Sequence, residues 1–362
     1  EENTKASIEK EMQYLYEKKS VADSLAYEKE KALSKAEIAR HKAELKMKKN
    51  QQYALFGGLF LIIIFSAFMY NRFRVTNKQK QIIESQKIIV EQKNTEIVDS
   101  IKYAKRIQSA ILPSDELINK ELKDFFILYH PKDIVSGDFY WVEKSPTLQK
   151  GGEGHIFFAA ADCTGHGVPG AMVSVVCANS LSKALLETRE ISPAKILDKT
   201  KQLVVEHFEK SGEDVKDGMD IALCSLKFDV KGLKLNNLET TALLQYAGAN
   251  NPLYITTKNT EGIAELTEIK PNKQPIGKYF RQESFTNHEV ELKKGDTIYI
   301  FTDGFADQFG GPKGKKMMYK PFKELLLKIN NKSMAEQKEI LEQHFYNWKG
   351  SLEQVDDVCV VG

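Results

Sequence analysis

The sequence predicts an α+β fold for residues 115–362, with antiparallel sheets and added helices, behind a long helical region that contains one apolar segment. The first observation is that several strand-like runs follow one another without an intervening helix, as around residues 221–256. This favours antiparallel sheets over a doubly wound parallel sheet. The second is a change in composition, because roughly the first hundred residues are mostly Lys, Glu and Gln, whereas the remainder has the mixed composition of one large domain.

The overall composition limits the possible partners and the compartment. The chain has 362 residues and a formal net charge of +2, with 42% hydrophobic and 28% charged residues, which is an ordinary globular balance. The small net charge gives no reason to expect a nucleic-acid partner. The four cysteines form no CxxC pair, and therefore neither a disulfide framework nor a zinc-site spacing: Cys163, Cys177, Cys224 and Cys359. Free thiols favour a reducing compartment, so we expect the C-terminal domain to be cytoplasmic.

The apolar segment predicts a transmembrane helix over residues 53–71. Ala54–Tyr70 carries no charged residue and is at the short end of the length needed to cross a bilayer. Tyr53 and Tyr70 stand at aromatic-belt positions, and Arg72 closes one end. A buried core helix is the alternative. Similar numbers of basic residues flank the segment on its two sides, so charge does not orient it in the membrane. We expect a single-pass cell-membrane protein, and the cysteine argument alone places its C-terminal domain on the cytoplasmic side.

Helices are predicted on both sides of this segment. Residues 1–52 read as a polar helical or coiled-coil segment, for which a solvated helix without a binding role is an open alternative. Residues 72–114 carry an apolar row with a seven-residue period: Ile83, Val90, Ile97, Ala104 and Ile111. This row predicts a parallel coiled coil and therefore a homodimer, although the second core row is poor and a plain spacer helix remains equally open. Pro113 is expected to end the helix.

The elements of the C-terminal domain follow from period and composition. Strands are predicted at Phe125–His130, Phe139–Val142, Ile156–Ala161, Ile221–Phe228, Leu244–Tyr246, Leu253–Thr256, Thr297–Thr302 and Val358–Val361. Helices are predicted at Ala171–Glu187, Ala194–Lys210, Lys320–Ile329 and Ser333–Trp348.

Aspartates recur where these strands end. Asp138, Asp162 and Asp303 each adjoin an apolar strand and a glycine-containing turn, and the pair Asp356–Asp357 precedes the last strand. One such aspartate is unremarkable, because turns favour Asp and Gly. Several carboxylates brought together would raise one another's pKa, a cost that hard divalent cations such as Mg²⁺ and Mn²⁺ relieve. The sequence contains no HExxH, GxSxG or Walker motif that would indicate another chemistry.

Six motifs then occur in a fixed order: SGDFYW, AADCTGHGVPGA, GANNPLYI, QPIG, FTDGFAD and DDVCVV. Together they resemble the SpoIIE-type branch of the PPM (PP2C-like) metal-dependent serine/threonine phosphatases over about residues 115–362. The resemblance implies an αββα sandwich, with two antiparallel sheets flanked by helices, and a centre of two Mn²⁺ or Mg²⁺ ions at one edge. It further implies hydrolysis of phosphoserine or phosphothreonine by a metal-activated water, on a regulatory protein such as an anti-sigma factor antagonist.

The resemblance also assigns site residues. Asp138 and Asp162 match the first two metal ligands, with Asp162 as the bridge, and the backbone carbonyl of Cys163 replaces the usual glycine carbonyl. Asp303 matches the ligand of the TDG motif. Asp356 matches the last ligand, and Asp357 remains a second candidate because a cysteine replaces the hydroxyl residue that usually ends the motif.

Some alternatives stay open on the sequence alone. No arginine matches the phosphate clamp of eukaryotic PP2C enzymes, so Lys132 or His166 would assist, unless they are a surface charge and a turn-shaping residue. A non-catalytic membrane scaffold and a membrane-anchored nucleotidyl cyclase are the competing functions, and the order of the motifs disfavours the cyclase.

Overall fold

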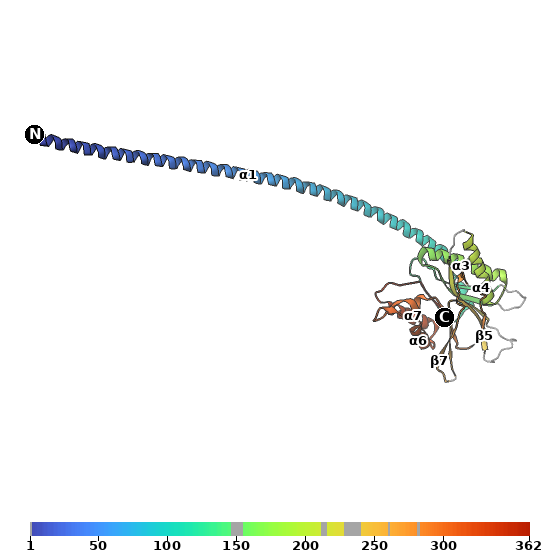
Figure 1. Ribbon diagram of the computed structural model, residues 1–362. Coiled ribbons are helices and arrows are strands. Elements are labelled where there is room, and N and C mark those ends of the chain that lie inside the picture. The colour runs from blue at the N-terminus through green and yellow to red at the C-terminus, as the bar shows by residue number, and fades with distance from the viewer. Residues whose placement is uncertain (1, 146–154, 211–215, 228–239, 260, 281–282) are drawn as a thin grey trace. The chain divides into compact units, whose positions relative to one another are not determined.

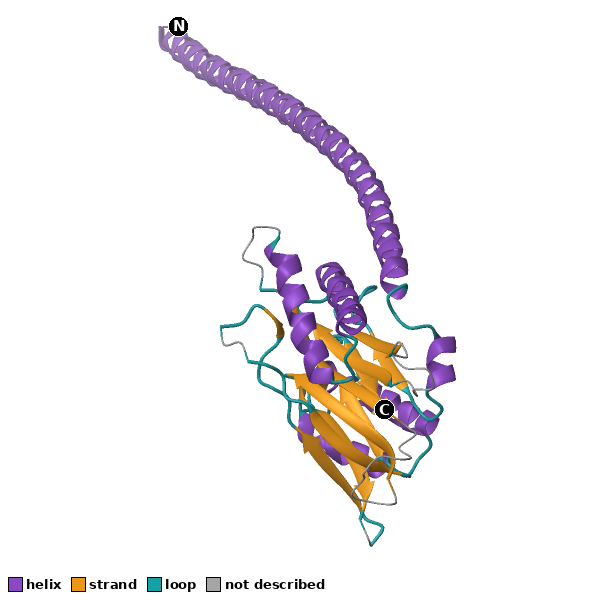
Figure 2. Cartoon of the chain, turned by 90° about the vertical axis from the view of Figure 1, so that its right-hand side faces the viewer, coloured by secondary structure: helices purple, strands orange, loops and turns teal. Residues whose placement is uncertain are grey.

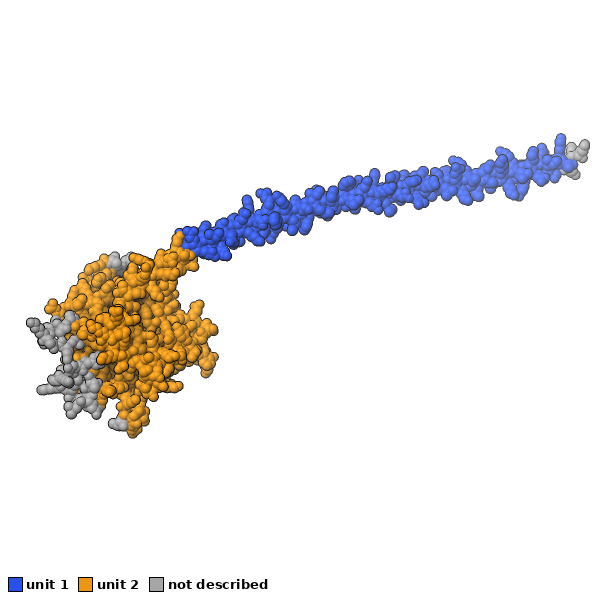
Figure 3. All heavy atoms as spheres, turned by 180° about the vertical axis from the view of Figure 1, so that it is seen from behind, with its two compact units in different colours: residues 1–93 blue, residues 94–362 orange. Residues whose placement is uncertain are grey.

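The computed structural model describes residues 2–145, 155–210, 216–227, 240–259, 261–280 and 283–362. The chain forms two compact units, residues 1–93 and residues 94–362 (Figure 3).

One helix, α1 (Glu2–Ser109), joins the three segments that the sequence separates (Figure 1). Its Lys, Glu and Ala residues are strong helix formers, and no proline interrupts them. The helix ends four residues before Pro113, where the Ile111 N–H donates to the Gln108 carbonyl in a closing turn. By length and composition α1 contains a stretch able to cross a membrane, and the side chains of that stretch are exposed, with Leu55 at 73% and Phe56 at 69%. The transmembrane segment and the coiled coil remain predictions.

Two antiparallel sheets make up the centre of the second unit. In its described residues the first sheet has the order β1-β13-β10-β6-β7, and the second has the order β2-β3-β4-β5-β9, with β8 paired to β4. The first sheet consists of β1 (Ile127–His130), β13 (Val358–Val361), β10 (Thr297–Phe301), β6 (Leu253–Lys258) and β7 (Ala264–Ile269). The second consists of β2 (Phe139–Lys144), β3 (Ile156–Cys163), β4 (Gly218–Lys227), β5 (Thr240–Ala249), β9 (His288–Lys293) and β8 (Ile276–Gly277). A short hairpin pairs β11 (Phe309–Gly310) with β12 (Lys315–Lys316).

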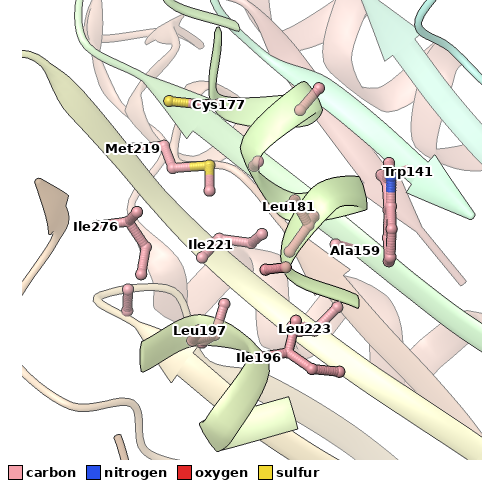
Figure 4. Packing of buried hydrophobic residues seen from close by; sticks show 14 of the residues in the cluster. Trp141, Ala159, Cys177, Leu181, Ile196, Leu197, Met219, Ile221, Leu223 and Ile276 are labelled. Carbon is pink, nitrogen blue, oxygen red and sulfur yellow. The ribbon is translucent and has the colours of Figure 1, made fainter. Parts of the chain in front are cut away.

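Helices cover the outer face of each sheet, which gives four layers (Figure 2). The second sheet lies under α3 (Gly167–Thr188) and α4 (Pro193–Glu209), whose Leu181 and Leu197 are fully buried against it (Figure 4). The first sheet lies under α6 (Tyr319–Ile329) and α7 (Met334–Lys349). A third apolar cluster fills the space between the sheets. The predicted α+β class with antiparallel sheets is confirmed.

The predicted elements of the domain recur within a few residues. The end of the predicted strand Ile221–Phe228 falls at Phe228, which lies outside the described residues. The sequence missed β7 and β9. It also missed several short elements: α2 (Asp115–Glu121), α5 (Gly304–Asp307), β8, β11 and β12. β7 and β9 are the outer strands of the two sheets and alternate exposed charged residues with partly buried ones. Outer strands carry less apolar sequence, because only one of their edges is paired.

Candidate metal centre

Strand register brings three aspartates into a row at one end of the second sheet. Asp162 on β3 pairs directly with Asp220 on β4. Phe139 pairs with Ala161, so Asp138, one residue before β2, continues the register to the position opposite Asp162. Residues directly opposite one another on antiparallel strands point to the same face. The row Asp138, Asp162 and Asp220 therefore follows from pairing alone.

Two more aspartates, at strand ends of the first sheet, line the same cavity. Asp303 follows β10 and occupies the position before the short helix α5 (Gly304–Asp307), and Asp356 precedes β13. A cavity of about 290 Å³ is lined by Asp162, Asp220, Asp303 and Asp356 together. Other parts of its wall come from Thr164, Gly165, His166, Lys216, Pro275 and Gly277. Carboxylates from both sheets thus meet in one cavity.

Asp138 is the buried member of this group of aspartates. Its side chain is 2% exposed, and within the described part of the chain no group bonds to its Oδ2 atom. The strand register places Asp138 opposite Asp162, and the charges of Asp303 and Asp356 act on Asp162. A buried carboxylate oxygen without a donor is costly unless a proton or a cation satisfies it.

Burial and mutual repulsion change the protonation of these groups. Burial, with repulsion from Asp162, raises the pKa of Asp138 well above its usual range. Burial, followed by repulsion from Asp303, Asp356 and Asp220, raises the pKa of Asp162 to about 8. Burial raises the pKa of Asp303 to about 6. Without a cation, the site therefore retains protons near neutral pH.

These residues fit hard divalent cations. The donors are carboxylate oxygens, one is unsatisfied, and a divalent charge would replace the retained protons. In the described ranges, no group of three or more His, Cys, Asp or Glu side chains is arranged so that these side chains alone could hold a metal ion. Mg²⁺ commonly binds through one or two carboxylates and keeps several waters.

Asp356 and Asp357 have different surroundings. The Asp357 side chain is 2% exposed, and its oxygens accept from the N–H groups of Lys132 and Gly137, each at 2.7 Å. Asp356 lines the cavity, and its Oδ1 accepts from the Asp357 N–H at 2.9 Å. The geometry therefore favours Asp356 for contact with a cation, and Asp357 for holding the chain around Gly137.

Close packing at glycines fixes this arrangement. A Cβ at Gly137 would stand 2.3 Å from the Gly165 carbonyl oxygen, and one at Gly304 would stand 2.0 Å from the Asp357 carbonyl oxygen. Both distances are too short for a real contact. The glycines next to Asp138 and Asp303 thus let the turns from different strands approach one another, and neither position has room for a side chain.

Cys163 supplies no nucleophile to the cavity. Its side chain is 3% exposed and packs in the core beneath α3, and burial raises the pKa of its thiol far above the usual range. A buried thiol of this kind is unreactive. Cys163 contributes to the cavity wall beside Asp162.

A chain of polar contacts lies beside the cavity. Lys132 Nζ is 3.2 Å from His166 Nε2, and His166 Nδ1 is 3.0 Å from Asp133 Oδ2. Because an ammonium group can only donate, His166 Nε2 accepts and the ring proton is on Nδ1, from which it is donated to Asp133. The two basic residues considered from the sequence are therefore in contact, and His166 lines the cavity.

Sequence reasoning missed Asp220. The motif DGMD places it two residues after Gly218, inside the start of β4 rather than at a strand end, so its local signal is weaker than that of the other aspartates. Asn250 Nδ2 donates to Asp220 Oδ1 at 2.8 Å, and Asn250 adopts a left-handed backbone conformation with φ of 58°. The GANNPLYI turn thus orients a carboxylate of the cavity.

Comparison with known proteins identifies the family. A sequence model of the family described as Stage II sporulation protein E (SpoIIE) matches residues 152–362. The chain belongs to the SpoIIE family. Its C-terminal domain is accordingly a PP2C-type, metal-dependent protein serine/threonine phosphatase, as the six motifs predicted.

Solved structures are also similar to this chain. The SiaA-PP2C domain of Pseudomonas aeruginosa is 30% identical, with a TM-score of 0.61, and the match covers 74% of this chain and 96% of that domain. The PP2C phosphatase domain and regulatory fragment of SpoIIE from Bacillus subtilis is 16% identical, with a TM-score of 0.48, over 66% of this chain and 62% of that one. The RsbU and RsbW domains of Rv1364c from Mycobacterium tuberculosis are 18% identical, with a TM-score of 0.47, over 66% and 58%. No curated protein matches the chain.

Proposed function

We propose that this SpoIIE-family chain is a membrane-anchored phosphatase that hydrolyses phosphoserine or phosphothreonine on a regulatory protein. In the proposed organisation, residues 1–52 form a polar helical segment, 53–71 cross the membrane once, 72–114 form a coiled-coil linker and 115–362 form a cytoplasmic phosphatase domain. The single observation that carries the catalytic proposal is the cavity in which carboxylates from both sheets converge.

In the proposed metal centre, Asp138, Asp162, Asp303 and Asp356 hold two Mn²⁺ or Mg²⁺ ions. The raised pKa values of the first three and the unsatisfied Oδ2 of Asp138 support this set. Asp162 is the proposed bridge, because β3 lies between β2 and β4 and Asp162 lines the cavity together with Asp303. The Cys163 carbonyl is an additional proposed ligand, and Asp357 supports the site through the backbone.

When bound, the two ions supply the positive charge that lowers the pKa of an attacking water and neutralises the phosphoryl oxygens. The protein's own groups prepare that reaction. The aspartates fix the donor oxygens on the ends of four strands, so that little reorganisation is needed. Lys132 and His166 place positive charge and a hydrogen-bonding ring beside the cavity, where the phosphate of a substrate side chain would enter.

The proposed substrate is a phosphorylated regulatory protein, such as an anti-sigma factor antagonist. The open cavity edge supports a protein substrate, because basic and polar groups line it, including Lys216, Thr164 and His166. The proposed regulation passes through the 72–114 linker of a homodimer. Its apolar row is exposed in the first unit and needs a partner surface, as Ile83 at 62% and Val90 at 65% illustrate.

The decisive experiment is Asp162→Asn in the full chain in detergent, assayed for Mn²⁺-dependent release of phosphate from a generic phosphate ester. Loss of one bridging carboxylate should lower the rate by at least about 100-fold. Asp124→Asn, on the exposed surface, is the matched control and should keep the wild-type rate. Unchanged activity in Asp162→Asn would sink the metal assignment.

A further inference from the structure

Gln108 is an unusual residue in α1. It is 5% exposed, and it is the one buried side chain in the described part of that helix. Glutamine is mostly found on the surface, and a buried amide needs hydrogen-bond partners. Its partners show what the last turn of α1 contributes to the second unit.

The amide of Gln108 binds the backbone of one residue in both directions. Its Nε2 donates to the Ser136 carbonyl, and its Oε1 accepts from the Ser136 N–H at 3.1 Å. Nε2 also donates to Ser174 Oγ at 2.9 Å, and Ser174 in turn donates to the Ala171 carbonyl at 2.8 Å. The buried backbone of Ser136 is therefore satisfied by a side chain from α1.

Ser136 begins the turn that carries Asp138. The next residue, Gly137, donates to Asp357, and Tyr129 Oη donates to the Asp138 carbonyl at 3.0 Å. The turn is thus held by Asp357 next to β13, by Tyr129 on β1 and by Gln108 on α1. Of these anchors, Gln108 alone lies in α1, near the end of the proposed 72–114 linker.

We propose that Gln108 is a positioning residue for Asp138, and that it connects the end of α1 directly to the metal centre. This inference rests on the proposed function. Loss of the amide would leave the Ser136 N–H and carbonyl unpaired in a buried place, so the turn would move to satisfy them. Asp138 lies two residues further on, so its carboxylate would lose its alignment with Asp162.

The test measures metal affinity separately from stability. In Gln108→Met, which keeps the length of the side chain and removes its hydrogen bonds, the Kd for Mn²⁺ by isothermal titration calorimetry should rise about 10–100-fold. Saturating Mn²⁺ should restore most of the hydrolysis rate. The control is Lys105→Met, at an exposed position three residues before Gln108 in α1, and it should bind Mn²⁺ like the wild type.

The possible outcomes separate the inference from the function. A lower Tm in Gln108→Met with an unchanged Kd for Mn²⁺ means a purely structural role, and overturns the inference. Ser174→Ala removes one partner of the amide and should raise the Kd for Mn²⁺ by less than Gln108→Met does. If Gln108→Met does not fold, the Kd of Ser174→Ala decides whether the contacts of Gln108 affect Mn²⁺ binding. A wild-type chain that binds Mn²⁺ but hydrolyses no phosphate ester refutes the proposed function, and the Kd comparison still decides the role of Gln108.

Discussion

At the scale of single residues, neighbouring aspartates with the same chemistry have different tasks. Asp356 lines the cavity, whereas Asp357 accepts two backbone N–H groups and keeps Gly137 and Lys132 in place. The sequence left these two residues open as alternatives for the last ligand. Which of the two lines the cavity depends on the direction in which each side chain points just before β13. Two adjacent aspartates in a sequence do not indicate that direction.

Substitution of the two residues should therefore have different effects. Asp357→Asn replaces one accepting oxygen by a donor facing a backbone N–H, at a cost of about 2 kcal/mol, which lowers Tm by roughly 4–8 °C for a domain of this size. Asp356→Asn should leave Tm nearly unchanged and weaken Mn²⁺ binding at least about 10-fold. Thermal unfolding in chelator and calorimetric titration measure these effects. The reverse pattern would make Asp357 the ligand.

At the scale of elements, the strand ends gather the site and α1 carries the proposed signal. Asp138, Asp162 and Asp220 need three adjacent strands in register, and Asp303 and Asp356 need the facing sheet. Along α1 the linker residues Ile83, Val90 and Ile97 are exposed. Gln108 is buried against the turn of Asp138. The helix thus combines an unpartnered apolar surface with one specific polar contact.

A substitution in the apolar row of the linker tests the proposed dimer. Val90 is 65% exposed and lies in the apolar row, so an aspartate there should repel its copy in a parallel pair. We expect Val90→Asp to increase the monomer fraction of the full chain in detergent, measured by light scattering with subtraction of the micelle. Ser85→Asp, which lies outside the row on the same helix, should keep the wild-type mass. An identical mass for all three proteins would contradict the coiled coil.

At the scale of the whole molecule, the metal centre links stability to pH. Folding raises the pKa of Asp138 well above its usual range, that of Asp162 to about 8 and that of Asp303 to about 6. The unfolded chain releases these protons near pH 4. The stabilisation from retained protons is therefore complete below about pH 4, and it is lost as the pH rises through the folded-state values toward about pH 8.

A bound cation should oppose this loss, because it replaces the protons and binds only the folded site. We expect the rise in Tm on adding Mg²⁺ to be larger at pH 8 than at pH 5.5. Fluorescence of the two tryptophans, Trp141 and Trp348, reports the unfolding of the phosphatase domain. In Asp162→Asn the rise should be small at both values. A rise that is independent of pH in the wild type would contradict the assigned protonation.

Local residue patterns predicted the family, the α+β class with its antiparallel sheets, and the motifs that carry Asp138, Asp162 and Asp303, because strand period and turn glycines are local properties of the chain. They missed Asp220 and the outer strands β7 and β9, whose local signals are weaker. Only the tertiary structure separated Asp356 from Asp357, brought Lys132 to His166, and showed that Gln108 on α1 holds Ser136. These features are contacts between residues far apart in sequence, or the direction in which a side chain points. Both depend on how the two sheets and the helix pack together.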